Sequence, residues 1–183
     1  PRKISKKYEV MIMFFYALES FYIIVIAVIV ICALDILYIA LIKPTIYKNK
    51  AIRLIKKAAL NNKKNVHIIK NKNEGCSFSI KVDEKTYNAK VLMSPKNCDL
   101  QINNIDTFIA YIKAGSDNMK AKSITGISTF MKNKLENKII IIPFKAKTIK
   151  KVINECEMVM VNPSVDVYNS KIYNANQIDE LFK

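Results

Sequence analysis

The chain has few of the residues on which common catalytic sites depend. It contains 183 residues but only one histidine, His67, and three glycines. A single imidazole offers one base for Ser/His/Asp or Cys/His chemistry, and no nucleophile elbow is present. Three glycines leave little material for a glycine-rich phosphate loop. The sequence therefore argues against hydrolase-triad chemistry and against a nucleotide-binding loop.

The four cysteines lack the spacing of a metal or redox motif. Cys32 lies inside an apolar run, and Cys76, Cys98 and Cys156 are far apart with no CxxC pair. Neither a zinc site nor a redox motif is indicated. Because the number of cysteines outside the apolar run is odd, the sequence suits a reducing compartment. No cofactor and no metal are predicted.

Arginine is scarce although the chain is strongly basic. Only Arg2 and Arg53 are arginines, among 30 Lys+Arg against 15 Asp+Glu, which gives a net charge of +15. This charge favours polyanionic surroundings such as nucleic acid or acidic lipid headgroups. Arginine binds phosphate better than lysine, because its guanidinium group donates two parallel hydrogen bonds. The scarcity of arginine therefore argues against specific nucleic-acid recognition. An AT-rich genome would also impose this mixture of Lys, Asn and Ile.

A long apolar run stands near the N-terminus. Residues 20–42 contain one charge, Asp35, and a helix of about 23 residues at 1.5 Å each crosses a hydrocarbon layer of ~30 Å. The apolar pattern begins upstream, so we predict a transmembrane helix over residues 10–43 behind a basic flank at residues 1–9. The run is longer than the core of a signal peptide and no A-x-A-like site follows it, which favours a retained helix.

The basic flanks predict the orientation of this helix. Residues 43–72 contain ten Lys/Arg and no acid, a stronger retention signal than the four basic residues of the N-terminal flank. We therefore expect a single-pass protein with a cytoplasmic C-terminal domain. Because both flanks are basic, a re-entrant helix with both ends in the cytoplasm is the alternative.

Two acids, Glu19 and Asp35, interrupt the apolar pattern. They are ~24 Å apart along a helix and roughly 160° apart around it, so they do not form one polar stripe. One interpretation places one or both near a headgroup boundary. The other has Asp35 face a partner helix, because an intramembrane carboxylate is costly unless it is paired. The second interpretation makes the helix a contact with other protein subunits.

The segment 44–65 is basic and carries an amphipathic pattern. Pro44 is expected to end the membrane helix, and Ala51, Ile55, Ala58 and Ala59 then share one side of a helix over residues 48–60. This helix either packs on the domain by its apolar side or docks on anionic lipid, and the two roles are compatible. The residues predicted to bind an anionic surface are Lys48, Lys50, Arg53, Lys56, Lys57, Lys63 and Lys64.

Residues 66–183 predict an α/β domain, an α+β mixed sheet with flanking helices. Period-2 and apolar runs bounded by turn residues predict strands at 66–69, 78–82, 87–93, 107–113, 138–144 and 158–161. Helical patterns predict helices at 123–135, 148–155 and 176–182.

Short strings in this domain resemble a known family. The segments VLMSPK (91–96), FIAYIK (108–113), KIIIIPFKAK and VMVN resemble the nuclease-related domain of the restriction-endonuclease-like superfamily. In that family a strand ending in an SPkG-like turn leads to a strand carrying Glu-x-Lys, and single membrane helices often precede the domain. The resemblance covers roughly residues 48–182 and implies a restriction-endonuclease-like fold.

The resemblance does not supply a complete nuclease site. Such a site needs two carboxylates to hold Mg²⁺ and a lysine to steady the attacking water. Lys113 stands at the lysine position, but Tyr111 stands at the glutamate position and Ala89 or Lys90 at the first aspartate. Only a migrated acid, Asp99 or Asp106, would restore a ligand. The resemblance therefore implies a nuclease-like scaffold without nuclease activity.

Three functions are compatible with these patterns. The leading hypothesis is a membrane-anchored, non-catalytic binding or scaffold subunit of a larger assembly. The second is a membrane-tethered nucleic-acid-binding module that uses the basic segment. The third is a Mg²⁺-dependent nuclease with a migrated acidic ligand.

Overall fold

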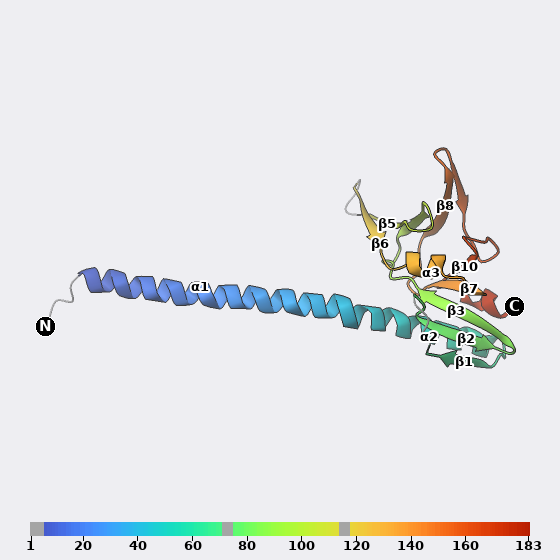
Figure 1. The fold of residues 1–183 in the computed structure, drawn as a ribbon, viewed down its shortest axis with the longest axis horizontal. Coiled ribbons are helices and arrows are strands. Elements are labelled where there is room, and N and C mark those ends of the chain that lie inside the picture. Colours follow the sequence, from blue (N-terminus) through green and yellow to red (C-terminus); the bar gives the residue numbers. More distant parts are fainter. Residues whose placement is uncertain (1–5, 71–74, 114–117) are drawn as a thin grey trace. The chain divides into compact units, whose positions relative to one another are not determined.

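The computed structural model describes residues 6–70, 75–113 and 118–183. The chain divides into two compact units, Pro1–Pro44 and Thr45–Lys183. The first unit contains a long apolar helix, and the second is an α+β domain with two mixed sheets (Figure 1). Parts of the predicted basic flanks, Arg2, Lys3 and Lys72, lie outside the described residues.

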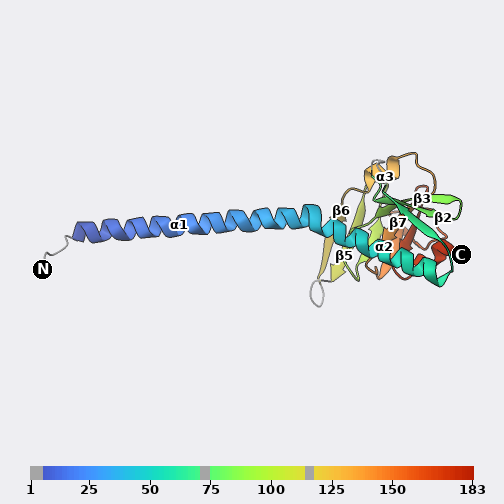
Figure 2. The same cartoon turned by 90° about the horizontal axis from the view of Figure 1, so that it is seen from below.

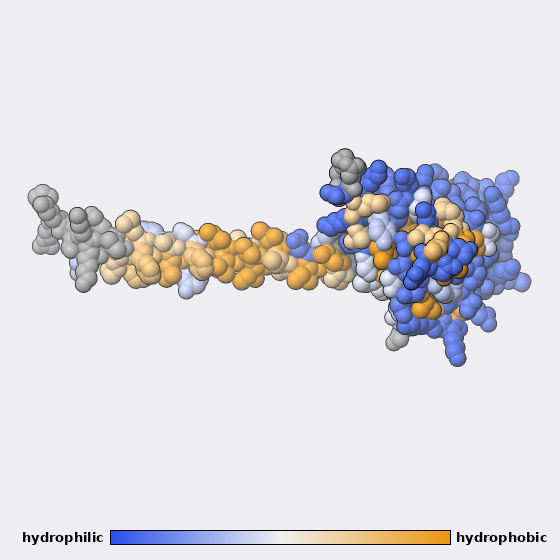
Figure 3. Space-filling view, turned by 90° about the horizontal axis from the view of Figure 1, so that it is seen from above, coloured by the Kyte–Doolittle hydropathy of each residue, from blue (hydrophilic) through white to orange (hydrophobic). Residues whose placement is uncertain are grey.

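Helix α1 (Lys6–Leu37) carries its apolar side chains outward. No described side chain of this helix is buried, and its surface is coloured as apolar over most of its described length (Figure 3). One helical stretch near the N-terminus, Met13–Asn61, is long and apolar enough to cross a membrane. Such a surface is satisfied by lipid rather than by water.

Pro44 does not end the helix, so that prediction was wrong. A π-helical turn, η1 (Tyr38–Ile42), follows α1, and helix α2 (Lys43–Asn61) continues from it. The backbone N–H of Lys43 donates to the carbonyl of Tyr38, five residues back. In a regular α-helix the proline ring would clash with the carbonyl four residues earlier, and the wider π turn accommodates it.

The domain contains two five-stranded sheets rather than the single sheet that was predicted. Sheet A has the order β1 (Val66–Ile69), β2 (Phe78–Val82), β3 (Lys85–Val91), β7 (Lys138–Ile142) and β10 (Ser170–Asn174). Sheet B has the order β6 (Met119–Ile124), β5 (Phe108–Lys113), β4 (Asp99–Ile102), β8 (Thr148–Asn154) and β9 (Glu157–Met160). In sheet A, β7 runs parallel to both β3 and β10, and in sheet B β4 runs parallel to β8; the other neighbours are antiparallel.

Two neighbouring chain segments pass together from sheet A to sheet B. Strand β3 leads to β4 and β7 leads to β8, with Pro95 and Pro143 in the two connections. The connections are hydrogen-bonded to each other, from Asn97 N to Lys145 O at 2.8 Å and from Lys147 N to Cys98 O at 2.8 Å. We call this paired passage the crossing.

The outer face of sheet A is covered by helices. The residues predicted to form the apolar side of α2, namely Ala51, Ile55, Ala58 and Ala59, are all buried there, which confirms that α2 packs on the domain (Figure 2). Tyr47 adds a polar contact, because its hydroxyl donates to the carbonyl of Ser94 in the crossing at 3.0 Å. The 3₁₀ helix η2 (Ile178–Phe182) covers the same face.

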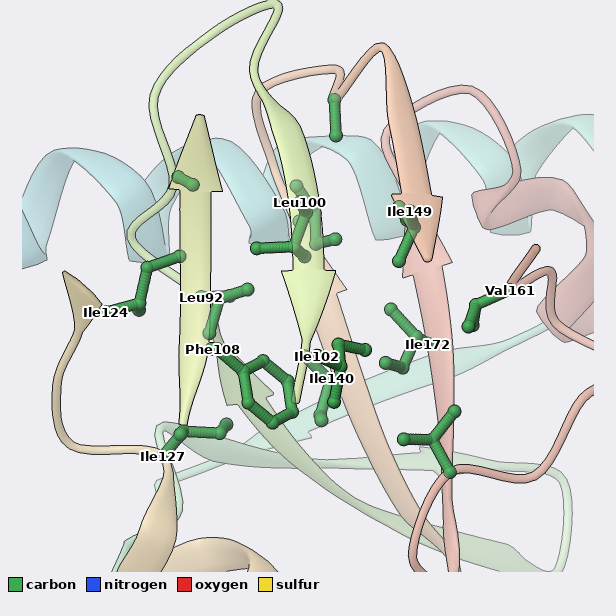
Figure 4. Close-up of a cluster of buried hydrophobic side chains, with 14 of the residues drawn as sticks. Leu92, Leu100, Ile102, Phe108, Ile124, Ile127, Ile140, Ile149, Val161 and Ile172 are labelled. Carbon is green, nitrogen blue, oxygen red and sulfur yellow. The ribbon is translucent and has the colours of Figure 1, made fainter. Parts of the chain in front are cut away.

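The inner faces of the two sheets enclose the larger core (Figure 4). Strand β7 is buried on both sides, with Ile140 and Ile142 in this core and Ile139 and Ile141 toward α2. This confirms the buried strand predicted from the run KIIII. Near one end, Lys138 Nζ donates to the carbonyls of Met131 and Asn133 at 2.7 and 3.1 Å.

Sequence patterns predicted most strands and fewer helices. Strands β1, β2, β5 and β9 lie where they were predicted within one residue, and β3 is shifted by two. The helix predicted at 148–155 was wrong, because these residues form β8, whose Ile149, Val152 and Ile153 fit both a helical and an extended pattern. The helix predicted at 123–135 is only α3 (Ser128–Lys132), and the closing helix is the short η2. Strands β4, β6 and β10 were not predicted.

Two glycines with similar backbone angles provide a test of packing around α3. Gly75 and Gly126 have φ of +84° and +77°, but a Cβ at Gly75 would lie 2.8 Å from the Phe130 backbone N, whereas Gly126 has open space. We expect Gly126→Ala to cost about 1–2 kcal/mol through the left-handed backbone alone. Gly75→Ala should cost about 1–3 kcal/mol more through overpacking.

Urea unfolding of the full chain in detergent, followed by tyrosine circular dichroism, measures both variants. Equal losses in the two would show that the space near Phe130 does not matter.

Candidate functional site

Asp99 and Lys113 lie near the same end of sheet B. Asp99 begins β4 opposite Tyr111 of β5, and Lys113 ends β5 two residues further on. The Asp99 carboxylate accepts a hydrogen bond from Thr148 Oγ1 at 2.6 Å. Lys113 is exposed. The carboxylate therefore already has a partner in the neighbouring strand.

Asp106 lies beyond the other end of β4. Lys132 Nζ is 2.8 Å from its carboxylate, and the Ser128 hydroxyl also donates to it. These two hydrogen bonds hold the pKa of Asp106 below the ordinary value of an aspartate. A four-residue strand spans about 13 Å, so Asp99 and Asp106 are not brought together.

The other positions of the nuclease resemblance lie in the other sheet. Ala89 and Lys90 belong to β3 of sheet A, whereas Tyr111 and Lys113 belong to β5 of sheet B. Burial lowers the pKa of Lys90, and the nearby Cys76 opposes that shift. Burial raises the pKa of the Cys76 thiol. Lys90 is therefore partly desolvated, and it lies in a different sheet from Tyr111 and Lys113.

Metal-binding residues do not gather in groups of three in the part of the chain that the structure describes. Among residues 6–70, 75–113 and 118–183, no group of three or more His, Cys, Asp and Glu residues could hold a metal ion. A nuclease of this kind needs two carboxylates around Mg²⁺, and the acids considered for that role, Asp99 and Asp106, lie at one end of β4 and beyond the other.

The outer face of sheet B is not covered by any helix of the described residues. Cross-strand pairs define it, because residues directly opposite each other share a face. One row runs from Ser123 through Ile109, Gln101 and Lys150 to Met160, across all five strands. A second row runs from Ala121 through Tyr111 and Asp99 to Thr148. We call these two rows, with Lys113, Met119, Val152 and Met158, the open face.

The open face is apolar at its edges and carries a shallow groove. Met119, Met158 and Met160 are 54%, 51% and 55% exposed. The groove has a volume of about 300 Å³ and is lined by Asp99, Leu100, Gln101, Tyr111, Met119, Thr148, Lys150 and Met158. None of the open-face side chains is buried.

Charge on the open face is mainly positive. Lys113 and Lys150 belong to it, whereas Lys120 and Lys122 project to the other side of β6, because they pair with Ile112 and Ala110. Its one acid among the described residues, Asp99, is hydrogen-bonded to Thr148. The face therefore offers methionine and tyrosine surface with two lysines, which suits an apolar segment that carries acidic residues.

The predicted anionic-surface residues divide into two groups. Lys64 is engaged with Asp83 at 2.7 Å, and Lys50 Nζ lies 3.7 Å from the centre of the Phe144 ring. Lys48 is half-buried. The remaining residues are exposed to solvent: Arg53, Lys56, Lys57 and Lys63.

Both acids of the apolar helix are exposed on α1. Glu19 and Asp35 have no ion-pair partner among the described residues. Their predicted roles at a headgroup boundary or against a partner helix stay predictions.

Comparisons with known proteins identify no relative. No family model, no curated protein and no solved structure matches this chain. The family resemblance therefore rests on the short strings alone.

Sequence reasoning missed the open face. Its methionines lie on β6, which was not predicted, and on β9, which was predicted without a neighbour. The sequence alternates apolar and basic residues at Met119, Lys120, Ala121 and Lys122, which indicates a strand with one apolar and one polar face. This pattern could have predicted β6. The row across five strands depends on pairing, which local patterns do not give.

The contact between Asp106 and Lys132 can be tested by titration. In Lys132→Met, the pKa of Asp106 should rise toward the ordinary value, because the ammonium is the largest cause of its lowering. The pKa of Asp106 is lower in the folded state than in the unfolded state. The contact therefore stabilises the folded state fully at pH values above the unfolded-state pKa, and this stabilisation is lost as the pH falls through the folded-state pKa. NMR titration of side-chain carboxyls measures the shift.

The matched control is Lys134→Met, which removes a nearby exposed lysine and should leave the Asp106 titration unchanged. An equal rise in the control would assign the shift to general charge rather than to the contact.

Proposed function

We propose that this protein is a membrane-anchored, non-catalytic binding subunit of a larger membrane-associated assembly. The observation that carries the proposal is the open face, where three methionines are about half exposed and two of them, Met119 and Met158, line a groove. Methionine side chains adapt to irregular partners and are frequent at binding surfaces. The partner is a protein segment with apolar side chains and acidic residues, because the charged side chains Lys113 and Lys150 of the open face are cationic.

The anchor in this proposal is the helix that precedes the domain. It is retained, crosses the membrane once and places the domain in the cytoplasm. Support comes from the length and composition of the apolar helix and from ten Lys/Arg without an acid in residues 43–72. Asp35, exposed on α1 without a partner among the described residues, supports a second contact with another subunit inside the membrane.

Nuclease activity is not part of this proposal. The restriction-endonuclease-like architecture stays a prediction from the strings VLMSPK and FIAYIK. The residues at its catalytic positions lie in two different sheets, and Asp99 and Asp106 lie at opposite ends of β4. Binding a partner without catalysis does not require carboxylates to converge, and the open face provides a surface for such binding.

Substitutions on the open face test the proposal. We expect the full chain, extracted from its own membranes in mild detergent, to migrate in a complex larger than the monomer. Met119→Glu with Met158→Glu should reduce the co-purified partner at least tenfold, which corresponds to about 1.4 kcal/mol, because the two carboxylates would replace apolar contact surface and repel the acidic residues of the partner. Native electrophoresis and mass spectrometry of the complex provide the measurement.

Met93→Glu is the matched control, since Met93 is 37% exposed and lies outside the open face. It should retain the partner, and circular dichroism should show the same fold in all variants. A monodisperse wild-type monomer with no partner would contradict the proposed function.

A further inference from the structure

Helix α2 presents two opposite sides of different chemistry. Its apolar side is buried in the core over sheet A. On the other side, Arg53, Lys56, Lys57 and Leu60 are exposed with spacings of three and four residues, so they are neighbours on one helix face. Lys63 is exposed just beyond the helix end. We call these five residues the basic stripe.

We propose that the basic stripe binds the headgroups of anionic lipids in the membrane that holds the chain. This inference rests on the proposed anchoring and adds a second, electrostatic contact to it. Lys50 and Lys64 are not included, because they are engaged with Phe144 and Asp83 within the domain.

Chain connectivity limits how far the stripe can lie from the end of the apolar run. Arg53 follows Ile42 by eleven residues, which is about 17 Å of helix. This length exceeds the Debye length of about 8 Å at physiological salt, so contact with the headgroups requires α2 to lie along the bilayer surface. A segment tethered this closely meets headgroups at a high effective concentration.

The charge of the stripe is not neutralised by the domain. Among the described residues, the ion pairs are Lys64 with Asp83 and Lys132 with Asp106, and neither involves the stripe. Residues 43–72 contain no acid that would screen it locally. The positive charge of the stripe is therefore available to an external anion.

Leu60 favours a lipid surface over a nucleic acid. It is 79% exposed in the middle of the basic residues. At a bilayer surface, an apolar side chain flanked by lysines reaches the boundary between headgroups and acyl chains, while the ammonium groups meet phosphate. A phosphate backbone would leave the leucine in water. Three of the four charges of the stripe are lysines, whereas the guanidinium group of arginine binds nucleic-acid phosphate better through two parallel hydrogen bonds.

A single tryptophan makes the contact measurable. The chain has no tryptophan, so Leu60→Trp introduces one fluorophore at an exposed position. The full-length variant is reconstituted in vesicles of phosphatidylcholine alone or of phosphatidylcholine with phosphatidylserine. We expect emission at shorter wavelength and quenching by brominated lipid only in the anionic vesicles, with both effects lost in high salt.

Two further variants in the Leu60→Trp background assign the effect. Arg53→Gln with Lys56→Gln and Lys57→Gln should abolish the emission shift and the quenching. Lys120→Gln, Lys122→Gln and Lys134→Gln remove the same charge from exposed positions elsewhere and should leave both unchanged. Equal loss in the two triple variants would overturn the proposal, because only net charge would then matter.

The remaining outcomes separate this inference from the anchor. Retention in the vesicles after carbonate washing, with the same emission in neutral and anionic lipid, overturns the basic-stripe proposal alone. Extraction by carbonate overturns the anchor and this inference together. A salt-sensitive emission shift on adding a short DNA duplex to the detergent-solubilised protein, larger than that in anionic vesicles, overturns the proposal in favour of nucleic acid.

Discussion

The crossing holds the domain together, because two parallel strand segments leave sheet A side by side and enter sheet B side by side. Hydrogen bonds from Asn97 to Lys145 and from Lys147 to Cys98 maintain the pairing where neither sheet supports it. Asn174 of β10 adds a clamp, since its side chain donates to the carbonyl of Ala146 and accepts from the N–H of Ala146. A buried amide satisfied at both ends fixes the backbone where unpaired groups would be costly.

The crossing also explains why the two sheets have different outer surfaces. Tyr47 of α2 binds the carbonyl of Ser94 and packs on Phe144, with 4.7 Å between the ring centres, so the helix is held to the crossing from the sheet A side. Sheet A is therefore covered, while the outer face of sheet B receives no helix from the residues of the domain that the structure describes. One sheet is therefore covered by helices on its outer side, and the other exposes a strand face.

Local patterns in the sequence predicted the features that depend on interactions between residues close together in the chain. The buried side of α2 and the hairpin strands β1 and β2 follow from periodicity and turn residues. Pro95 and Pro143 mark strand ends in the sequence, but only pairing shows that both connections enter a second sheet. The candidate acids show the same limit: Asp99 and Asp106 are seven residues apart, and the unpredicted strand β4 separates them. Long-range pairing was therefore the missing information, for the fold and for the site.

The groups with shifted pKa values are not gathered at one place in the described part of the domain. Active sites gather groups with shifted pKa values in one cleft. Here the groups with shifted pKa values are dispersed. Burial within the domain shifts the pKa values of Lys90, Cys76 and Tyr173, burial near α3 lowers that of Lys138, burial beside Asp99 raises that of Cys98, and the hydrogen bond from Lys132 lowers that of Asp106. None of these groups lines the groove of the open face. The groove instead combines adaptable methionines, one tyrosine and a lysine with a carboxylate that is already hydrogen-bonded, a composition suited to hold a partner's side chains without reacting with them.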